Sequence, residues 1–341
     1  MTKTFRRRIY FLIGLAISAI LVWFLFRNID TAQLWAALQQ ANYWWFLPTV
    51  VIIIFTMYQR AYRWNMMLAP IKRVEFQNLL AATCIGFMAN NVLPLRMGEF
   101  VRAYSLASQD KGITKSASLA TIFVERMVFD LVALLVIFGG VMTFSSTLKD
   151  HIDQKTVLGI YISIGIALVG IILTILLAVR PKSVGDFLAK YLFFLPETAK
   201  EFSKLIILRF SRGLEFLRDI KAVASITFQT LLIWVLMGIS NYFVFAAFNF
   251  DLPFDAAFVL LVVVSISILL PSSPGFVGVY HVGVVWSLNV YGIERESALS
   301  CAIVLHVVQY LVITFMGFYY LKKEHLSLKV LEEEASESSP A

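Results

Sequence analysis

The sequence predicts an all-α polytopic membrane protein, and three observations support this class. Of its 341 residues, 59% are apolar and only 15% are charged, whereas a soluble domain carries about 25% charged residues. The apolar residues gather in runs of about 20, the length that crosses a bilayer as a helix. The alternating ~10-residue pattern of membrane β-strands is absent. A soluble enzyme, a disordered chain and a disulfide-stapled domain are therefore excluded.

Six apolar runs are long enough to be full transmembrane helices. The first, Ile9 to Phe26, follows a basic N-terminus that contains Lys3 and three arginines. A signal peptide has an apolar core of only about 7–15 residues, so we expect this run to be a retained anchor helix. The expected full spans are residues 9–27, 42–62, 122–146, 157–179, 226–250 and 298–321.

Two further apolar stretches, residues 77–107 and 256–291, are broken by proline and glycine. The breaks are residues 93–98 (Leu-Pro-Leu-Arg-Met-Gly) and 271–278 (Pro-Ser-Ser-Pro-Gly-Phe-Val-Gly). Because proline removes a donor and clashes with the preceding turn, each stretch should form two half-helices joined by irregular backbone. The halves are short for a crossing, so we expect two broken re-entrant hairpins. Two short complete spans are the alternative for each stretch.

Basic residues fall on one side of the membrane if both termini are cytoplasmic, as the positive-inside rule requires. Residues 60–75, with Arg60 and Arg63, then form a cytoplasmic segment. The net charge of +7 thus reflects topology, and no nucleic-acid-binding module is visible. We expect one transmembrane domain in the cell (cytoplasmic) membrane. Its parts are residues 1–325, with a cytoplasmic amphipathic connector at 180–224, followed by an acidic disordered tail at 326–341.

The two broken stretches match each other at a constant offset of 180 residues. Pro94 aligns with Pro274 and Gly98 aligns with Gly278. An odd number of full spans separates the stretches, so they should have opposite orientations in the membrane. Such inverted repeats, about 76–148 and 256–321, are typical of secondary transporters with a midplane site. An old duplication retained only for packing is the alternative.

Charged and polar residues beside the breaks are the candidate site. A single unpaired charge at the centre of a membrane helix costs about 2.5–3.5 kcal/mol, so these charges should pair or face water. Arg126 and Asp130 are four apart and can pair; structural pairing alone is the alternative to a binding role. Backbone N–H groups of the second break could bind an anion. The candidate substrate-binding residues are Asn90, Asn91, Arg96, Glu99, Arg102, Glu125, Arg126, Asp130, Ser272, Ser273, Gly275, Gly278, His281 and His306.

No motif for hydrolysis, nucleotide binding or metal binding is present, and the four histidines are scattered. We therefore expect no catalytic residue, no metal and no cofactor. The two cysteines, Cys84 and Cys301, lie in apolar stretches and are expected to pack as small core residues.

The run from Asn90 to Arg102, together with Glu125-Arg126 and Asp130, resembles the lysylphosphatidylglycerol synthase transmembrane region, also described as flippase-like. The second break resembles its second motif, except that Phe276 follows Gly275 and His281 stands where relatives often have glutamate. The resemblance covers nearly the whole chain. It implies the membrane part of proteins associated with moving a lipid between leaflets. No cytoplasmic segment could hold the soluble aminoacyl-transferase domain of lysyl-lipid synthases, so we expect no such synthesis by this chain alone.

These observations predict a lipid translocase that moves a phospholipid or lipid-linked headgroup, with an anionic membrane lipid as its partner. Two other classes stay open. One is an intramembrane enzyme acting on a lipid phosphate or lipid-linked sugar, with Glu99 or Glu125 as base. The other is a membrane scaffold without transport. A homo-oligomer or a separate lipid-modifying enzyme is also open as a partner.

Overall fold

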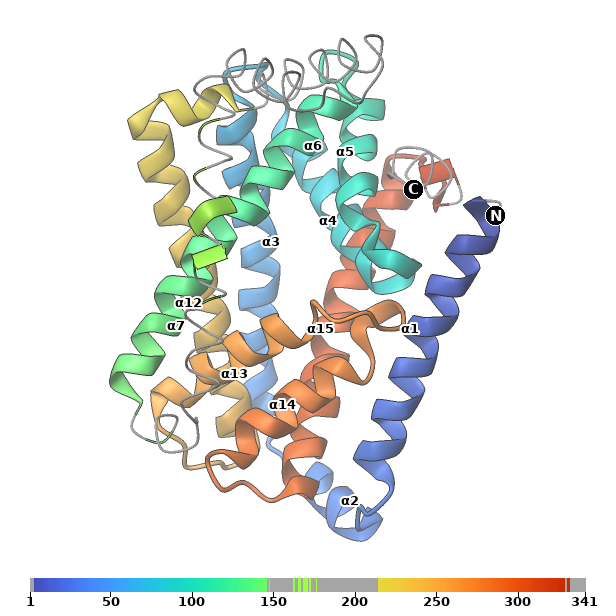
Figure 1. Cartoon of the computed structure of the whole chain (residues 1–341), viewed down its shortest axis with the longest axis vertical. Helices are drawn as coiled ribbons and strands as arrows, with labels where there is room; N and C mark the ends of the chain where they lie inside the picture. Colours follow the sequence, from blue (N-terminus) through green and yellow to red (C-terminus); the bar gives the residue numbers. More distant parts are fainter. Residues whose placement is uncertain are drawn as a thin grey trace.

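The computed structural model describes residues 3–145 and 214–328, together with 147, scattered residues between 162 and 176, and 330 and 331. Within these parts all regular elements are helical, as the sequence predicts (Figure 1). The expected span 157–179 and the connector 180–224 fall largely outside the described residues.

In the described parts of the chain, the helices of more than 20 residues run along the molecule (Figure 1). Among the described residues, α12 and α15 are long and apolar enough to cross a membrane on their own. Residues Leu12–Phe26 of α1 and helix α2 form a further candidate span that is bent by 90°. The long helices are α1 (Lys3–Phe26), α3 (Phe46–Leu68), α12 (Ile220–Ala247) and α15 (Arg295–Lys323).

Helix α2 (Thr31–Gln40) begins at a cap that turns the chain away from α1. The Asp30 carboxylate accepts hydrogen bonds from Ala32 N at 2.8 Å and from Gln33 N at 3.3 Å, which satisfies free donors of the first turn. Trp35 in α2 and Trp44 in the 3₁₀ turn Tyr43–Trp45 are 60% and 82% exposed. Exposed tryptophans at one end of the molecule are typical of a membrane–water interface.

The first broken stretch is a helical hairpin. Helix α4 (Phe76–Val92) leads through the 3₁₀ turn Pro94–Arg96 into α5 (Gly98–Gln109). The two helices pack so closely that a Cβ on Gly86 would lie 2.6 Å from the Cβ of Arg102. The second stretch has the same plan. Helix α13 (Phe254–Ser267) leads through the 3₁₀ turn Pro274–Phe276 into α14 (Val279–Asn289).

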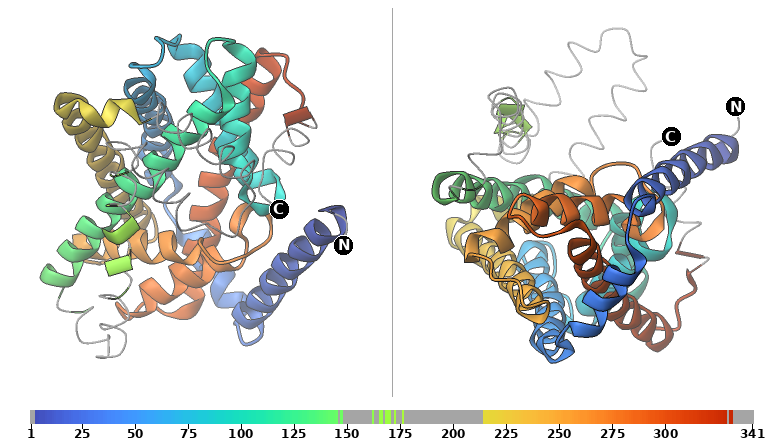
Figure 2. Two further views of the ribbon diagram at one scale, coloured as in Figure 1. Left: turned by 45° about the horizontal axis from the view of Figure 1, so that its top comes forward. Right: turned by 90° about the horizontal axis from the view of Figure 1, so that it is seen from below.

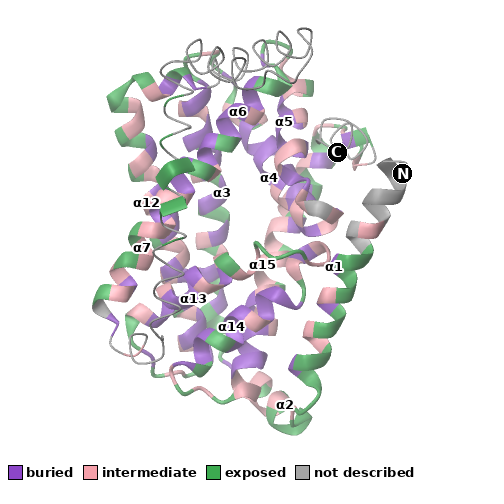
Figure 3. Ribbon diagram, viewed as in Figure 1, coloured by how far each residue is buried: buried purple, intermediate pink, exposed green. Residues whose placement is uncertain are grey.

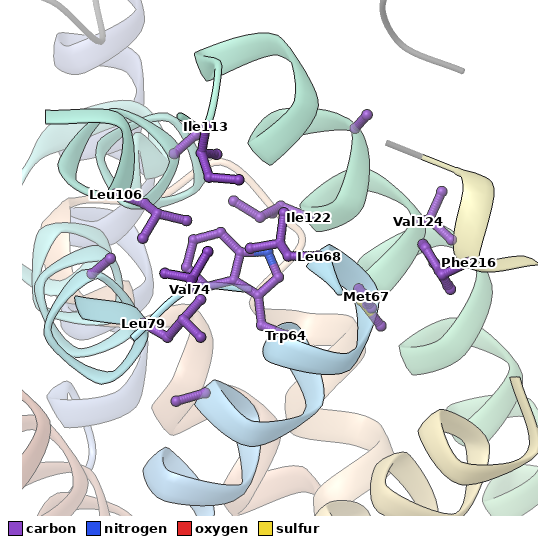
Figure 4. Close-up of a cluster of buried hydrophobic side chains, with 14 of the residues drawn as sticks. Trp64, Met67, Leu68, Val74, Leu79, Leu106, Ile113, Ile122, Val124 and Phe216 are labelled. Atoms are coloured by element: carbon purple, nitrogen blue, oxygen red, sulfur yellow. The ribbon is translucent and has the colours of Figure 1, made fainter. Parts of the chain in front are cut away.

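A continuous helical segment joins the first hairpin to the residues beyond 145. It consists of α6 (Lys115–Val124), a π-helical segment (Glu125–Asp130) and α7 (Leu131–Phe144). Helices α4, α5 and α6 enclose the end of α3, where Trp64 is fully buried (Figure 4). Burial is highest in this inner layer, whereas α1 and α2 are largely exposed (Figure 3).

The two hairpins occupy opposite halves of the molecule, and their broken turns meet between them (Figure 1). Helix α1 stands outside the other helices in both views of Figure 2. Its contacts with the bundle include the 3₁₀ turn Pro94–Arg96 and α14, so α1 passes both breaks. Leu326, Leu328 and Leu331, at the start of the expected tail, pack in the same apolar cluster as α5 residues.

Candidate functional site

The π-helical segment directs two carboxylates to one arginine. Arg63 Nη2 lies 2.9 Å from Glu125 Oε1, and Arg63 Nη1 lies 2.7 Å from Asp130 Oδ1. Five residues of an ordinary α-helix turn about 500°, which would point these two side chains about 140° apart. In a π-helix each residue turns the chain by a smaller angle, so residues i and i+5 lie closer together around the axis. The wider turn therefore allows both carboxylates to bind the same guanidinium.

The sequence places Arg63 in the segment after a span that ends at residue 62, and the expected end of that span is wrong. Helix α3 continues to Leu68, and Arg63 is 0% exposed within the bundle. The apolar run ends near residue 62, so a hydropathy argument stops the helix there. Arg63 also donates to Thr230 Oγ1 at 2.8 Å, and Trp234 Nε1 donates weakly to Asp130 Oδ1 at 3.5 Å. Sequence reasoning missed both partners because hydroxyl and indole groups are common in membrane helices.

Two more arginines complete the ion-pair cluster. Arg102 Nη1 lies 3.0 Å from Glu125 Oε1, and its guanidinium lies over the Trp64 ring at 4.0 Å. Arg126 Nη1 lies 3.0 Å from Asp130 Oδ2, which confirms the expected i,i+4 pair. Arg126 Nε also lies 3.7 Å from Glu99 Oε1, at the partly exposed edge of the cluster.

The energetics of this cluster depend on its being complete. Glu125 and Arg63 are 0% exposed, and removing such ions from water costs several kcal/mol each. Their mutual attraction offsets that cost only while every partner is present. We therefore treat Arg63, Glu125 and Asp130 as one structural unit, whatever else the cluster binds.

The two breaks are in direct contact through Arg96. Its Nη1 donates to the carbonyl oxygen of Ile268 at 2.9 Å, and its guanidinium lies over the Phe276 ring at 5.3 Å. Arg96 and Phe276 both have positive φ, at 53° and 60°. Two non-glycine residues at equivalent places in the two turns thus adopt a conformation that is uncommon and often found at functional sites.

The asparagines of the first break close the hairpin and attach it to α15. Asn90 Oδ1 accepts from Gly98 N at 2.8 Å, so it satisfies a donor at the start of α5, as expected for freed backbone. Asn90 Nδ2 donates to Glu99 Oε1 at 3.4 Å. Asn91 Nδ2 donates to Thr314 Oγ1 at 3.0 Å. Glu99 therefore links the break to the ion-pair cluster.

Two backbone N–H groups of the second break have hydrogen-bond partners within the protein. Ser273 N donates to Ser18 Oγ of α1 at 2.8 Å, and Gly278 N donates to His281 Nδ1 at 3.4 Å. The N–H groups of Ser273 and Gly278 are thus hydrogen-bonded within the protein, and anion binding at this break stays a prediction. Ser18 was missed because a single serine in an apolar helix gives no sequence signal. Ser272 touches α1 instead: a Cβ on Gly14 would lie 2.7 Å from its carbonyl oxygen.

Two histidines lie beside the second break. His306 Nε2 is 2.8 Å from the carbonyl oxygen of Gly275, and its ring lies 4.9 Å from that of His281. Tyr280 stacks on His306 at 4.5 Å. If Nε2 of His306 carries the hydrogen, it donates to the carbonyl oxygen of Gly275, whose φ of 73° favours glycine. These histidines support the turn and do not join the ion-pair cluster.

A search of the described parts of the chain finds no group of three or more His, Cys, Asp or Glu that could hold a metal. Cys84 and Cys301 are buried free thiols, as expected.

An all-helical chain with apolar spanning helices and a buried polar core defines a helical membrane protein. The chain belongs to the family described as the lysylphosphatidylglycerol synthase TM region, whose model matches residues 11–317. This confirms the resemblance found in the sequence.

Two relatives have similar sequences. Glycosyltransferase AglD of Haloferax volcanii is 23% identical over 364 residues, which cover 97% of this chain and 57% of that protein. UPF0104 membrane protein MJ1078 of Methanocaldococcus jannaschii is 23% identical over 244 residues, which cover 70% of this chain and 95% of that protein. The chain thus spans little more than half the length of AglD. No solved structure matches.

Proposed function

We propose that this protein is a translocase that moves a lipid with an anionic headgroup between the leaflets of the cytoplasmic membrane. The observation that carries the proposal is the position of Arg96, which bridges two broken hairpins beside a buried ion-pair cluster. Charged side chains in an apolar bundle are expensive to bury, and in membrane proteins they commonly mark the path of a polar substrate or a proton. The family takes its description from the membrane region of a lipid synthase, which supports a lipid as the substrate.

In this proposal the headgroup enters the polar space between the hairpins while its acyl chains stay in the bilayer. Arg96 attracts the headgroup phosphate, because a guanidinium binds phosphate oxygens in a planar, bidentate geometry. Glu99 and Arg126 continue the polar path toward the cluster. Separation of the two breaks, which are joined here by a guanidinium–carbonyl hydrogen bond and a cation–π contact, opens the path.

The repeat supports alternating access around this site. The two 3₁₀ turns lie 180 residues apart, and α5 and α14 end at Gln109 and Asn289, again 180 apart. We infer that the hairpins are re-entrant inverted repeats that approach from opposite leaflets. The start of α1 and the end of α15 lie in the same half of the molecule as the first hairpin, which fits cytoplasmic termini (Figure 1).

A liposome assay tests the proposal. The purified full chain is reconstituted with a fluorescent phosphatidylglycerol, and dithionite quenching measures the lipid in each leaflet over time. We expect movement with the wild type and at least roughly tenfold slower movement with Arg96→Ala or Glu99→Ala, since each removes a charge-assisted contact. Unchanged rates in both variants, or no movement with the wild type, would overturn the proposal.

A second function is an intramembrane transferase, which the name of the glycosyltransferase relative favours. Glu99 is the better base for it, because its side chain is 26% exposed. Glu125 is fully buried and bound by both Arg63 and Arg102, so it is held as a carboxylate and cannot easily accept a proton. Mass spectrometry of lipids incubated with the protein separates the two functions. A new lipid species supports the transferase, and unchanged species with altered sidedness support the translocase.

A further inference from the structure

Arg60 differs from the other buried arginines in its surroundings. It is 5% exposed, and its Nη2 has only the Met237 sulfur as a polar neighbour, at 3.2 Å. Its Nε has no hydrogen-bond partner. In the described parts of the chain, no carboxylate lies within ion-pair distance of Arg60. A buried guanidinium without a carboxylate in direct contact is costly, so its retention needs a reason.

The neighbouring arginines have their carboxylates. Arg63 binds Glu125 and Asp130, Arg102 binds Glu125, and Arg126 binds Asp130. In α3, α5 and the π-helical segment, the four arginines Arg60, Arg63, Arg102 and Arg126 face the three carboxylates Glu99, Glu125 and Asp130. One positive charge is in excess in this set, and Arg60 is its member without a carboxylate in ion-pair contact.

Phe87 of α4 separates Arg60 from the accessible edge of the cluster. Its ring lies 4.9 Å from the Arg60 guanidinium and 5.1 Å from that of Arg126. Arg126 has a side chain that is 28% exposed, so it is the outer of the two arginines. An anion that arrives at Arg126 would reach Arg60 by displacing one aromatic ring, without breaking any carboxylate pair.

We propose that Arg60 is the inner binding site for a phosphate group, and that Phe87 occupies its place when no anion is bound. This inference deepens the proposed function and rests on it for the claim that the phosphate belongs to a lipid. A cation–π contact is weaker than an ion pair, so a phosphate oxygen can replace it. Arg63 and Arg102, held by carboxylates, position the cluster and do not exchange partners. The division separates arginines that bind the ligand from arginines that maintain the fold.

The test measures binding and stability on the full chain in a non-ionic detergent. Isothermal calorimetry uses two probes, dihexanoylphosphatidylglycerol and inorganic phosphate. We expect Arg60→Met to weaken binding by at least roughly tenfold, because a charge-assisted contact is lost. Its Tm should equal or exceed that of the wild type, because an uncompensated buried charge has been removed. Arg60→Lys keeps the charge but not the planar fork, and should bind with intermediate affinity.

Arg73→Met is the matched control, since it removes the same charge from an exposed position in the loop after α3. It should leave both binding and Tm unchanged. The inference would be overturned if Arg60→Met and Arg60→Lys bind the probes as tightly as the wild type. It would also be overturned if Arg60→Met lowers the Tm as much as Arg63→Met does. A wild-type protein that binds neither of the two probes would overturn it as well.

The outcomes also separate this inference from the translocase proposal. Arg60-dependent binding of phosphate by a protein that moves no lipid in liposomes supports the anion site and overturns the translocase. Lipid movement that is equally fast with Arg60→Met supports the translocase and overturns the role of Arg60. Binding of inorganic phosphate without binding of the short-chain lipid supports a site for free phosphate at Arg60.

Discussion

The Nη1 atom of Arg96, in the turn of the first hairpin, donates a 2.9 Å hydrogen bond to the carbonyl oxygen of Ile268, at the end of α13 in the second. Carbonyl groups in the last turn of a helix have no partner within that helix. Arg96 satisfies one of them from the opposite half of the molecule. The two hairpins are thus joined by a hydrogen bond that breaks when either hairpin moves away from the other.

Replacing Arg96 should affect lipid movement more than stability. Arg96→Ala removes one part-buried hydrogen bond to Ile268 and leaves no carboxylate without its partner, so we expect a Tm within a few degrees of the wild type. We expect transport to fall at least roughly tenfold, with partial recovery in Arg96→Lys. Liposome transport and a detergent unfolding curve measure the two effects.

Arg295→Ala is the matched control for that experiment. Arg295 also donates to helix-end carbonyls, those of Phe24 and Leu25 at 2.6 and 3.1 Å, but at the far end of α1. It should lower Tm slightly and leave the transport rate per folded molecule unchanged. A loss of transport equal to that of Arg96→Ala would mean that any arginine cap suffices, which contradicts a special role for the break.

Breaking the ion-pair cluster should destabilise the protein strongly. Asp130→Leu leaves Arg63 and Arg126 with one carboxylate fewer in a buried site. Loss of one partner of a buried pair costs about 3–5 kcal/mol. The free energy of unfolding in mixed micelles measures this effect. A cost below about 1 kcal/mol would show that water already solvates Asp130, and the cluster would then be a wet cavity.

The surface ion pair between Lys72 and Asp110 should contribute little and should depend on pH. The hydrogen bond from Lys72 lowers the pKa of the Asp110 carboxyl, with Gly112 N as a second donor. The stabilisation is fully present above the ordinary pKa of about 3.9 and is lost as the pH falls through the lowered native value. Lys72→Met should thus cost about 0.2–1 kcal/mol at pH 7 and nothing well below pH 3.9. A difference that stays constant between pH 7 and pH 3, measured against Lys111→Met, would contradict this assignment.

The helical class, the two breaks and the pair Arg126–Asp130 could be predicted because each is local in sequence. Apolar runs define helices, and Pro94 and Pro274 define turns. A spacing of four defines a helix face. These features depend on neighbours along the chain, which the sequence contains in full.

The identity of the cluster's central arginine could not be predicted in this way. Arg63 follows an apolar run, and charge at the end of such a run normally indicates the membrane surface. Its true position depends on Glu125 and Asp130, which lie more than sixty residues away and share one face only because the helix there widens to a π-helix. The π-helical segment itself has no sequence signature, and neither does the contact between Ser18 and the second break.

That contact gives the most direct test of motion at the second break. Ser18 Oγ lies 3.0 Å from Ser273 Oγ and donates to Val277 O at 2.8 Å, so α1 and the turn are held together at one point. In the double variant Ser18→Cys, Ser273→Cys, the two thiols should be close enough to form a disulfide under mild oxidation.

If the break must move relative to α1 for each transport cycle, oxidation should stop transport and a reductant should restore it. The single variants are the controls, because Cys84 and Cys301 are buried and should not react. Transport at an equal rate in the oxidised and reduced double variant would mean that α1 and the second hairpin move as one body, and the moving contact would then have to be that between Arg96 and Ile268.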